Sequence, residues 1–273
     1  MKQQPKLLRL VESALMLAVA TVLSLVKLLD LPYGGSITVC SALPILLVAY
    51  RHGTGFGLLT GFAHAAIQLL LGTSTLSYAT SAWAAVAIIL LDYLLAFTVL
   101  GLSGVFRRRM SQTRALVWGA ALTGGLRYIL HVIAGCTVWA GLSIPTTAAL
   151  WYSLGYNATY MLPETLVNVL GVWYLSRALD LSKVVPARAP AAAPLSRGAL
   201  VLSLSSAAVA VVTAVWDILL VFRHLQDEET GDFIITGLAR VNWPLFAMVT
   251  VAGVAVTAVL YALSRRAAKS AAE

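Results

Sequence analysis

Residues 124–139 read GGLRYILHVIAGCTVW, an apolar stretch that carries an arginine and a histidine and ends in a tryptophan. Its composition suits a helix in lipid, because about 20 apolar residues span the hydrocarbon core of a bilayer. A charged side chain at the bilayer centre costs about 2.5–3.5 kcal/mol on insertion scales, so Arg127 and His131 are expected to face a partner or a cavity. The stretch therefore predicts a membrane-spanning helix with one polar face.

The rest of the chain has the same character. Of its 273 residues, 60% are apolar and only 11% are charged, and the mean hydropathy is +0.87. A water-soluble domain of this length cannot bury so much apolar surface, so we expect a protein of the lipid bilayer. Eight segments are candidate spans, of which the second is short: 7–29, 36–50, 54–72, 79–106, 115–140, 149–176, 198–222 and 241–264.

The net charge of +8 is distributed by side of the membrane. When the eight spans are laid out in alternation, the connections on one side hold only Arg223 and Arg240. Cytoplasmic loops are enriched in lysine and arginine, so the basic side is predicted to be cytoplasmic, with both termini on it. This pattern favours a multi-pass protein of a bacterial cell membrane over a protein that binds nucleic acid. The basic side carries Lys2, Lys6, Arg9, Arg51, Arg107, Arg108, Arg109, Arg114, Arg177, Lys183, Arg188, Arg197, Arg265, Arg266 and Lys269.

The composition changes once along the chain, at SKVVPARAPAAAPLSR (182–197). Proline and alanine replace the long aliphatic side chains there, and a helix cannot continue through that many prolines. We therefore expect an all-α polytopic membrane protein in three parts. Residues 1–182 are expected to form a six-helix membrane domain, 183–197 a linker, and 198–273 a two-helix transmembrane extension without an assigned role.

Polar side chains gather in the outer half of the predicted body. Arg127, His131 and Trp139 share one broad face of their helix, because four residues rotate by about 40° and eight by about 80°. Asp92 lies inside AIILLDYLLAF, and Asn157 lies in the outer half of the sixth segment. A carboxylate beside aromatic rings suits an organic cation, because the rings attract positive charge and the carboxylate offsets its desolvation. The residues predict an outward-opening pocket for an aromatic, polar, positively charged ligand.

Other interpretations of these polar groups stay open. Asp92 and Arg127 could form an interhelical ion pair that only holds the bundle together. His64, Gln68 and Asp217 are expected to be packing groups. Glu164 follows Pro163 and is expected to accompany a kink, and Glu12 to lie at the interface or to pair with Arg9. Cys40 and Cys136 lack the spacing of a metal or disulfide site, and no metal or cofactor is predicted.

Four stretches, taken in order and spacing, resemble one known family. They are LPYGGSITVCSALPILLVAYRHG (31–53), LLDYLLAFTVLGLSG (90–104), LRYILHVIAG (126–135) with Trp139, and WYSLGYNATYMLP (151–163). Together they resemble the thiamine-specific substrate-binding (S) component of energy-coupling factor (ECF) vitamin transporters over roughly residues 5–180. The resemblance implies a six-helix protein that captures thiamine outside and docks on an energising module of one transmembrane coupling protein and two ATPase subunits.

The resemblance also implies roles for individual residues. Asp92 and Tyr93 correspond to ligand contacts, and Arg127 to a basic residue one turn before a histidine. His131 and Trp139 correspond to the pair that brackets the thiazolium ring, and Tyr152 and Asn157 to groups that hold the aminopyrimidine. Gly35 stands where some members have a tryptophan, so Tyr33, Tyr78 or Trp83 would supply the stacking. The small residues Ala14 and Ala18 correspond to the contact with the coupling protein.

Two other functions are the alternatives to a vitamin-capturing S component: an intramembrane enzyme and a secondary transporter. An intramembrane enzyme would need a nucleophile and base or a metal set such as HExxH, and neither spacing occurs, so no enzyme is predicted. A secondary transporter for a cationic aromatic metabolite or a thiamine precursor remains the alternative, with Asp92 as a proton site. No GxxxxGK[ST] sequence occurs in the chain, which fits an ATPase supplied by a partner.

Overall fold

The computed structural model describes residues 5–31, 34–79, 81–141, 146–189, 196–224 and 235–270. The chain divides into two compact units, Met1–Ala189 and Pro190–Glu273. The boundary falls inside the segment 183–197, which the sequence predicts to be a linker. We describe each unit separately, the first as the body and the second as the extension.

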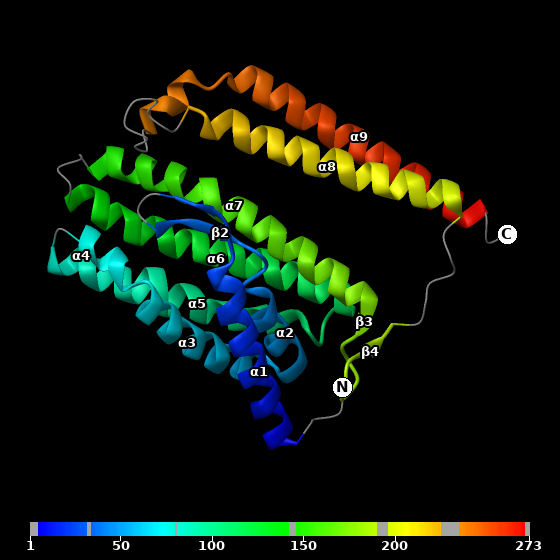
Figure 1. The fold of residues 1–273 in the computed structure, drawn as a ribbon, viewed down its shortest axis with the longest axis horizontal. Coiled ribbons are helices and arrows are strands. Elements are labelled where there is room, and N and C mark those ends of the chain that lie inside the picture. Colours follow the sequence, from blue (N-terminus) through cyan, green and yellow to red (C-terminus); the bar gives the residue numbers. More distant parts are fainter. Residues whose placement is uncertain are drawn as a thin grey trace. The chain divides into compact units, whose positions relative to one another are not determined.

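In its described residues the body contains six helical rods (Figure 1). The fourth rod is continuous but changes its helix type three times along its length, whereas α6 and α7 are long α-helices that pack along each other. The rods are α1 (Lys6–Leu25), α2 (Leu43–His52), α3 (Thr54–Leu71), the fourth rod made of α4 (Ala82–Ala87), η3 (Ile88–Leu95), α5 (Ala96–Thr98) and η4 (Val99–Phe106), then α6 (Gln112–Gly141) and α7 (Thr146–Ala178).

Six helices of the described chain are long and apolar enough to cross a membrane: α1, α3, the fourth rod, α6, α8 and α9. The predicted span 36–50 differs from the structure, because only the ten residues of α2 are helical there, about 15 Å at 1.5 Å per residue. Cys40 with φ 55° precedes α2, and Gly53 with φ 98° ends it. Every residue of α2 is buried. It serves as a central packing element, and Leu46 and Tyr50 belong to its core cluster.

Two short hairpins accompany the helices. The predicted helix 7–29 ends earlier than expected, because Val26 is extended and β1 (Lys27–Asp30) follows. β1 pairs antiparallel with β2 (Ser36–Thr38), with Leu29 opposite Ile37. A second hairpin, β3 (Leu179–Asp180) with β4 (Ala187–Arg188), follows α7. The β1–β2 hairpin therefore occupies the region between α1 and α2 that the sequence assigns to helix and loop.

Glycines let α3 and η4 pack with their backbones in contact. A Cβ added at Gly101 would lie 2.1 Å from the backbone nitrogen of Leu58. A Cβ at Gly57 would lie 2.9 Å from the Cα of Gly101. Small residues allow such close approach of helices in lipid. The small residues Gly57 and Gly61 on α3 and Gly101 on η4 thus serve helix packing.

A buried arginine joins α1, α2 and the segment after α7. Arg51 pairs with Glu12 through its Nε and, at 3.0 Å, through its Nη2. It also donates hydrogen bonds to the carbonyl oxygens of Leu181 (2.7 Å), Lys183 (3.1 Å) and Val184 (2.9 Å). The expectation that Glu12 pairs with Arg9 is wrong. Its carboxylate is bound instead by Arg51 and by the neighbouring His52, both on α2. We call Glu12, Arg51 and these three carbonyls the arginine clamp.

The described part of the extension consists of α8 (Arg197–Phe222), η5 (Ile235–Arg240) and α9 (Trp243–Ser270). α8 begins at Ser196, whose hydroxyl accepts a hydrogen bond from the backbone N–H of Ala199. α8 and α9 pack against each other, and Thr250 on α9 donates a hydrogen bond of 2.9 Å to Asp217 on α8. Asp217 is therefore a packing group, as expected. The acidic residues 227–229 and 232 lie outside the described residues.

Candidate functional site

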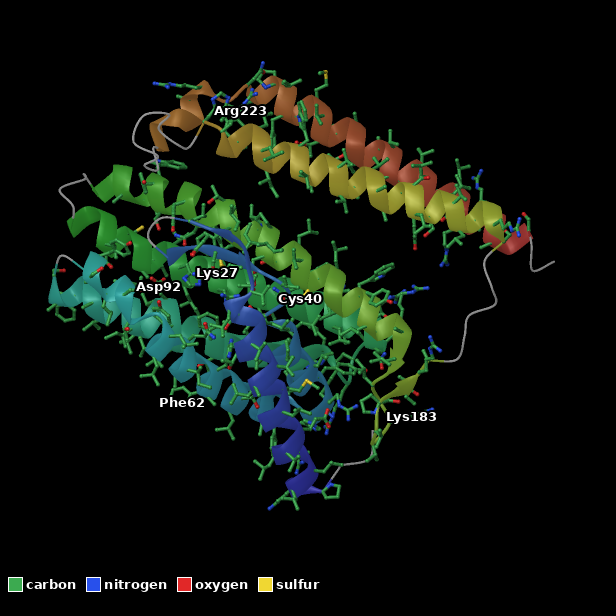
Figure 2. The ribbon with its side chains drawn as sticks, in the orientation of Figure 1. Lys27, Cys40, Phe62, Asp92, Lys183 and Arg223 are labelled. Atoms are coloured by element: carbon green, nitrogen blue, oxygen red, sulfur yellow. The ribbon has the colours of Figure 1, made fainter. Side chains whose placement is uncertain are left out.

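The body encloses one candidate ligand cavity of about 360 Å³. Ligand sites in proteins are typically clefts of about 300–1,000 Å³, so this cavity suits a small ligand. Its wall comes from the end of α1, the β1–β2 hairpin, α3 with η2 (Thr73–Tyr78), the fourth rod, α6 and α7. Figure 2 marks two lining residues from different elements, Asp92 on the fourth rod and Lys27 on the hairpin.

Asp92 and His131 form a hydrogen-bonded pair in the wall of the cavity. The Asp92 Oδ1 lies 2.8 Å from the His131 Nδ1, which donates because a carboxylate only accepts. The His131 Nε2 is buried and has no hydrogen-bond partner in the described chain. Asp92 lies in η3, an eight-residue π-helix. Such helices are rare and concentrate at functional sites, and no sequence pattern used here predicts one.

Asn157 is held by a network between α6 and α7. Its Nδ2 donates to the Ser153 carbonyl oxygen at 2.8 Å and to the His131 carbonyl oxygen at 3.3 Å. Its Oδ1 accepts a hydrogen bond of 2.6 Å from the Tyr160 hydroxyl. The Tyr160 ring in turn meets the His131 ring edge-on, with centroids 6.1 Å apart. A buried amide needs hydrogen-bond partners, and Asn157 has them on both its nitrogen and its oxygen. These bonds hold α7 in place against α6 beside His131.

Arg127 does not pair with Asp92, so the interhelical ion pair considered from the sequence is wrong. Its guanidinium lies 4.7 Å from the ring centroid of Phe97, a cation–π contact, and its Nε is buried without a hydrogen-bond partner in the described chain. His64 meets the same Phe97 ring edge-on at 5.3 Å and is fully buried. Arg127 is thus held over an aromatic face and lines the cavity.

The structure brings five of the predicted ligand residues to the cavity: Asp92, Tyr93, Arg127, His131 and Asn157. The Tyr93 hydroxyl donates to the Gly72 carbonyl oxygen at 2.9 Å, which connects the fourth rod to α3. Tyr152 is half-buried one turn before Tyr156 and is not among the residues that line the cavity. Its role stays a prediction.

Two predicted contacts cannot be placed in this way. Tyr33 lies outside the described residues. Trp139 belongs to α6 by its backbone, and its side chain is outside the described set. Of the alternatives for stacking, Tyr78 lines the cavity, whereas Trp83 is 80% exposed and does not line it.

Several lining residues were missed as site residues in the sequence analysis. In sequence, Tyr156 and Tyr160 fit an interfacial aromatic belt equally well, but both are buried and line the cavity. Gln68 donates a hydrogen bond of 2.8 Å to the Ser24 hydroxyl, and both residues line the cavity. Glu164 lines it as well. The four-residue spacing of 156, 160 and 164 is the signal that could have found the α7 contribution, because such residues share a helix face.

The predicted partner-contact residues lie on α1. Ala14 and Ala18 are both exposed in the body, and large apolar side chains, Val11, Leu15 and Val22, are exposed on the same helix. In the described chain no group of three His, Cys, Asp or Glu side chains is close enough to hold a metal ion. Cys40 and Cys136 are free thiols.

Comparison with known proteins gives consistent matches over the body. The family model described as thiamine transporter protein (Thia_YuaJ) matches residues 10–183. The thiamine transporter ThiT of Bacillus subtilis is 36% identical over 180 residues, which cover 61% of this chain and 89% of that protein. A solved structure of ThiT from Listeria monocytogenes is 25% identical, with a TM-score of 0.51, and covers 63% of this chain and 94% of that one. The family match extends over most of the chain and includes every predicted ligand residue, so the chain belongs to the thiamine transporter family of membrane proteins.

Proposed function

We propose that this protein captures thiamine from outside the cell in the cavity of the body, as the S component of an ECF transporter. The observation that carries the proposal is the Asp92–His131 pair set among tyrosine rings in a cavity of about 360 Å³. Thiamine is an aromatic cation, and carboxylates and ring faces both favour a bound cation in a site of low dielectric constant. Membership of the thiamine transporter family supports the same ligand.

The polar groups of the cavity divide the recognition between the two rings of thiamine. Asp92, His131 and the predicted Trp139 would attract and stack on the thiazolium, which carries the positive charge. The Asn157 Oδ1, which keeps a second lone pair, would accept a hydrogen bond from the aminopyrimidine, and Tyr152 is proposed to hold the same ring. Arg127 would be a further polar contact to the ligand, because it lines the same cavity.

Energy for transport would come from a partner. The chain contains no GxxxxGK[ST] sequence. ATP would therefore be hydrolysed by the ATPase subunits of the energising module. The exposed small residues Ala14 and Ala18 on α1 offer the coupling protein a surface for close helix packing. Both termini are proposed to be cytoplasmic, because the basic residues gather on that side. Thiamine would then be released inward when the loaded subunit reorients on its partner.

Titration of the purified protein with thiamine, followed by tryptophan fluorescence, tests the ligand. We expect saturable quenching by thiamine and weaker quenching by its separate pyrimidine and thiazole halves. Stronger binding of one half would favour the alternative of a precursor transporter.

Uptake into proteoliposomes tests the transport class. We expect thiamine uptake only when the energising module and ATP are present. Uptake by the protein alone under a proton or sodium gradient would contradict the S-component assignment and support secondary transport.

A further inference from the structure

Glu164 is the second carboxylate of the cavity, and the proposed function gives it no part. It lies on α7 directly after Pro163, is 3% exposed, and lines the cavity together with Arg127. Burial of a carboxylate is costly unless hydrogen bonds and charges compensate it, so its partners reveal what holds it in place. Those partners belong largely to the β1–β2 hairpin, more than 120 residues away in the sequence.

Both oxygens of Glu164 are bound by one residue of the hairpin. The backbone N–H of Thr38 donates to Oε2 at 2.7 Å, and the Thr38 hydroxyl contacts Oε1 at 2.8 Å. The same hydroxyl lies 2.7 Å from the Ser41 hydroxyl. A hydroxyl has one hydrogen, and a carboxylate only accepts, so Thr38 donates to Glu164 and accepts from Ser41. Charge-assisted bonds of this kind are about twice as strong as neutral ones.

This contact is where β2 is fastened to the body near the ligand. Thr38 is the last residue of β2, and Thr38 and Ser41 line the cavity. A second bond joins the hairpin to α7, because the Gly35 N–H donates to the Tyr156 hydroxyl at 2.9 Å. Tyr156 and Glu164 are eight residues apart on the same face of α7 and hold the two ends of the segment 35–38.

Arg127 brings a positive charge into the same cavity as Glu164. Arg127 and Glu164 both line the cavity, but they are too far apart to form an ion pair. A carboxylate there partly balances the arginine charge, which would otherwise repel a cationic ligand in the same low-dielectric space. An amide at position 164 would leave Arg127 as a less compensated cation in the wall.

We propose that Glu164 is a positioning residue for ligand capture: it fastens β2 to the cavity through Thr38 and so sets how long a bound ligand is retained. The inference rests on the proposed function for its ligand, thiamine, but the fastening itself is a property of the protein without ligand. Glu164 acts through the hairpin, and no contact with thiamine is assigned to it.

The test compares Glu164→Gln, Thr38→Val and the double variant in full-length protein. Glutamine keeps the shape of Glu164 but loses the charge and one acceptor oxygen, and valine removes only the hydroxyl of Thr38. We expect thiamine to dissociate about tenfold faster from the glutamine variant and about threefold faster from the valine variant. Both changes break the same contact. The increase in the thiamine dissociation rate of the double variant should therefore be smaller than the product of the two single increases.

Hydrogen exchange without ligand separates this role from a general loss of stability. In Glu164→Ala, the amides of residues 35–39 should exchange at least tenfold faster than in wild type, with exchange in α2 unchanged. Thr159→Val is the matched control, because the Thr159 hydroxyl bonds only within α7 to the Tyr156 carbonyl oxygen. It should alter neither dissociation nor hairpin exchange.

The outcomes distinguish this inference from the proposed function. Wild-type dissociation rates in Glu164→Gln, or multiplicative effects in the double variant, would overturn the positioning role. So would unchanged exchange at residues 35–39 in Glu164→Ala, or faster exchange spread evenly over the body. If wild type fails to bind thiamine at all, the proposed function fails, and the exchange measurement still decides whether Glu164 fastens the hairpin.

Discussion

At the scale of single residues, burial decides which charges of this protein act on a ligand. The side chains of Asp92 and His131 are 21% and 10% exposed, so their interaction is only weakly screened by water. The exposed pair of Lys27 and Asp30, by contrast, is expected to add little to stability. A cation that enters the cavity therefore meets the Asp92 carboxylate in surroundings where water screens their attraction only weakly.

Replacing Asp92 by asparagine should weaken thiamine binding by about 2 kcal/mol, a factor of about 30 in Kd. The amide can still accept from His131, but it no longer offers a negative charge to the ligand. Isothermal titration with thiamine measures the effect.

Asp180→Asn is the matched control for this change. Asp180 is a partly exposed carboxylate outside the membrane-spanning helices, and hydrogen bonds from the Ser182 hydroxyl and backbone N–H lower its pKa. This variant should bind thiamine as wild type does. Equal affinity of the Asp92 variant and wild type would remove Asp92 from the site.

The residues of the candidate site were only partly predictable from the sequence. Asp92, Arg127, His131 and Asn157 were found because a polar group inside an apolar helix is conspicuous. Tyr156 and Tyr160 were not, because tyrosines in the outer half of a span are equally expected at the lipid interface. Asp92 pairs with His131 and not with Arg127. This depends on how the helices are rotated about their axes, which cannot be deduced from the composition of the segments.

At the scale of elements, the contact between α3 and η4 should depend on glycine. Gly101→Ala would place a methyl group 2.1 Å from the Leu58 backbone nitrogen, so the two helices must separate. We expect a loss of about 3 kcal/mol or more in stability, comparable to overpacking a core. Thermal unfolding in detergent measures it.

Gly55→Ala is the control for this contact, because a Cβ at Gly55 meets nothing within 4 Å. Alanine favours helix over glycine by about 1 kcal/mol, so the variant should be as stable as wild type or slightly more stable. A Gly101 variant that melts together with wild type would show that the helices tolerate separation.

The arginine clamp should stabilise the body without touching the ligand. Glu12→Gln leaves the Arg51 guanidinium, whose side chain is 2% exposed, without its counter-charge. Breaking one partner of a buried ion pair costs about 3–5 kcal/mol, so the melting temperature should fall clearly.

The thiamine affinity of the Glu12 variant should stay within about threefold of wild type, because neither Glu12 nor Arg51 lines the cavity. Affinity and melting temperature are measured on the same preparation. A large loss of affinity at unchanged stability would reverse this assignment.

Element types were predictable where apolar runs are long, as in α1, α3 and α6. They were not predictable between residues 26 and 52, where the chain reverses direction in a short hairpin before α2. Tertiary contacts decide this region: β1 and β2 pair with each other, and α2 is buried on all sides although it is only ten residues long. An apolar run of that length is equally compatible with a strand, a buried helix or part of a span.

At the scale of the whole molecule, the body and the extension are separate compact units. The family match ends at residue 183, and all of the described residues that line the cavity lie in the body. Ending the chain after Ala189 should therefore leave thiamine affinity within about threefold of the full-length value. Fluorescence titration of both forms checks this.

The truncated chain keeps residues 181–184, so the arginine clamp stays complete. A cut after Asp180 is the comparison, because it removes the three carbonyl partners of Arg51 and should yield an unstable protein. If the protein that ends at Ala189 is stable but no longer binds thiamine, part of the site lies in the extension.

The arginine clamp also sets an order of events during biosynthesis. Arg51 leaves the ribosome with the first helices, whereas the carbonyl groups it binds are synthesised 130 or more residues later. Until then a guanidinium that ends fully buried has only Glu12 and water as partners. Membrane insertion of the early helices would thus precede their final fixation, and the nascent body would depend on its last few residues to become resistant to quality-control proteases.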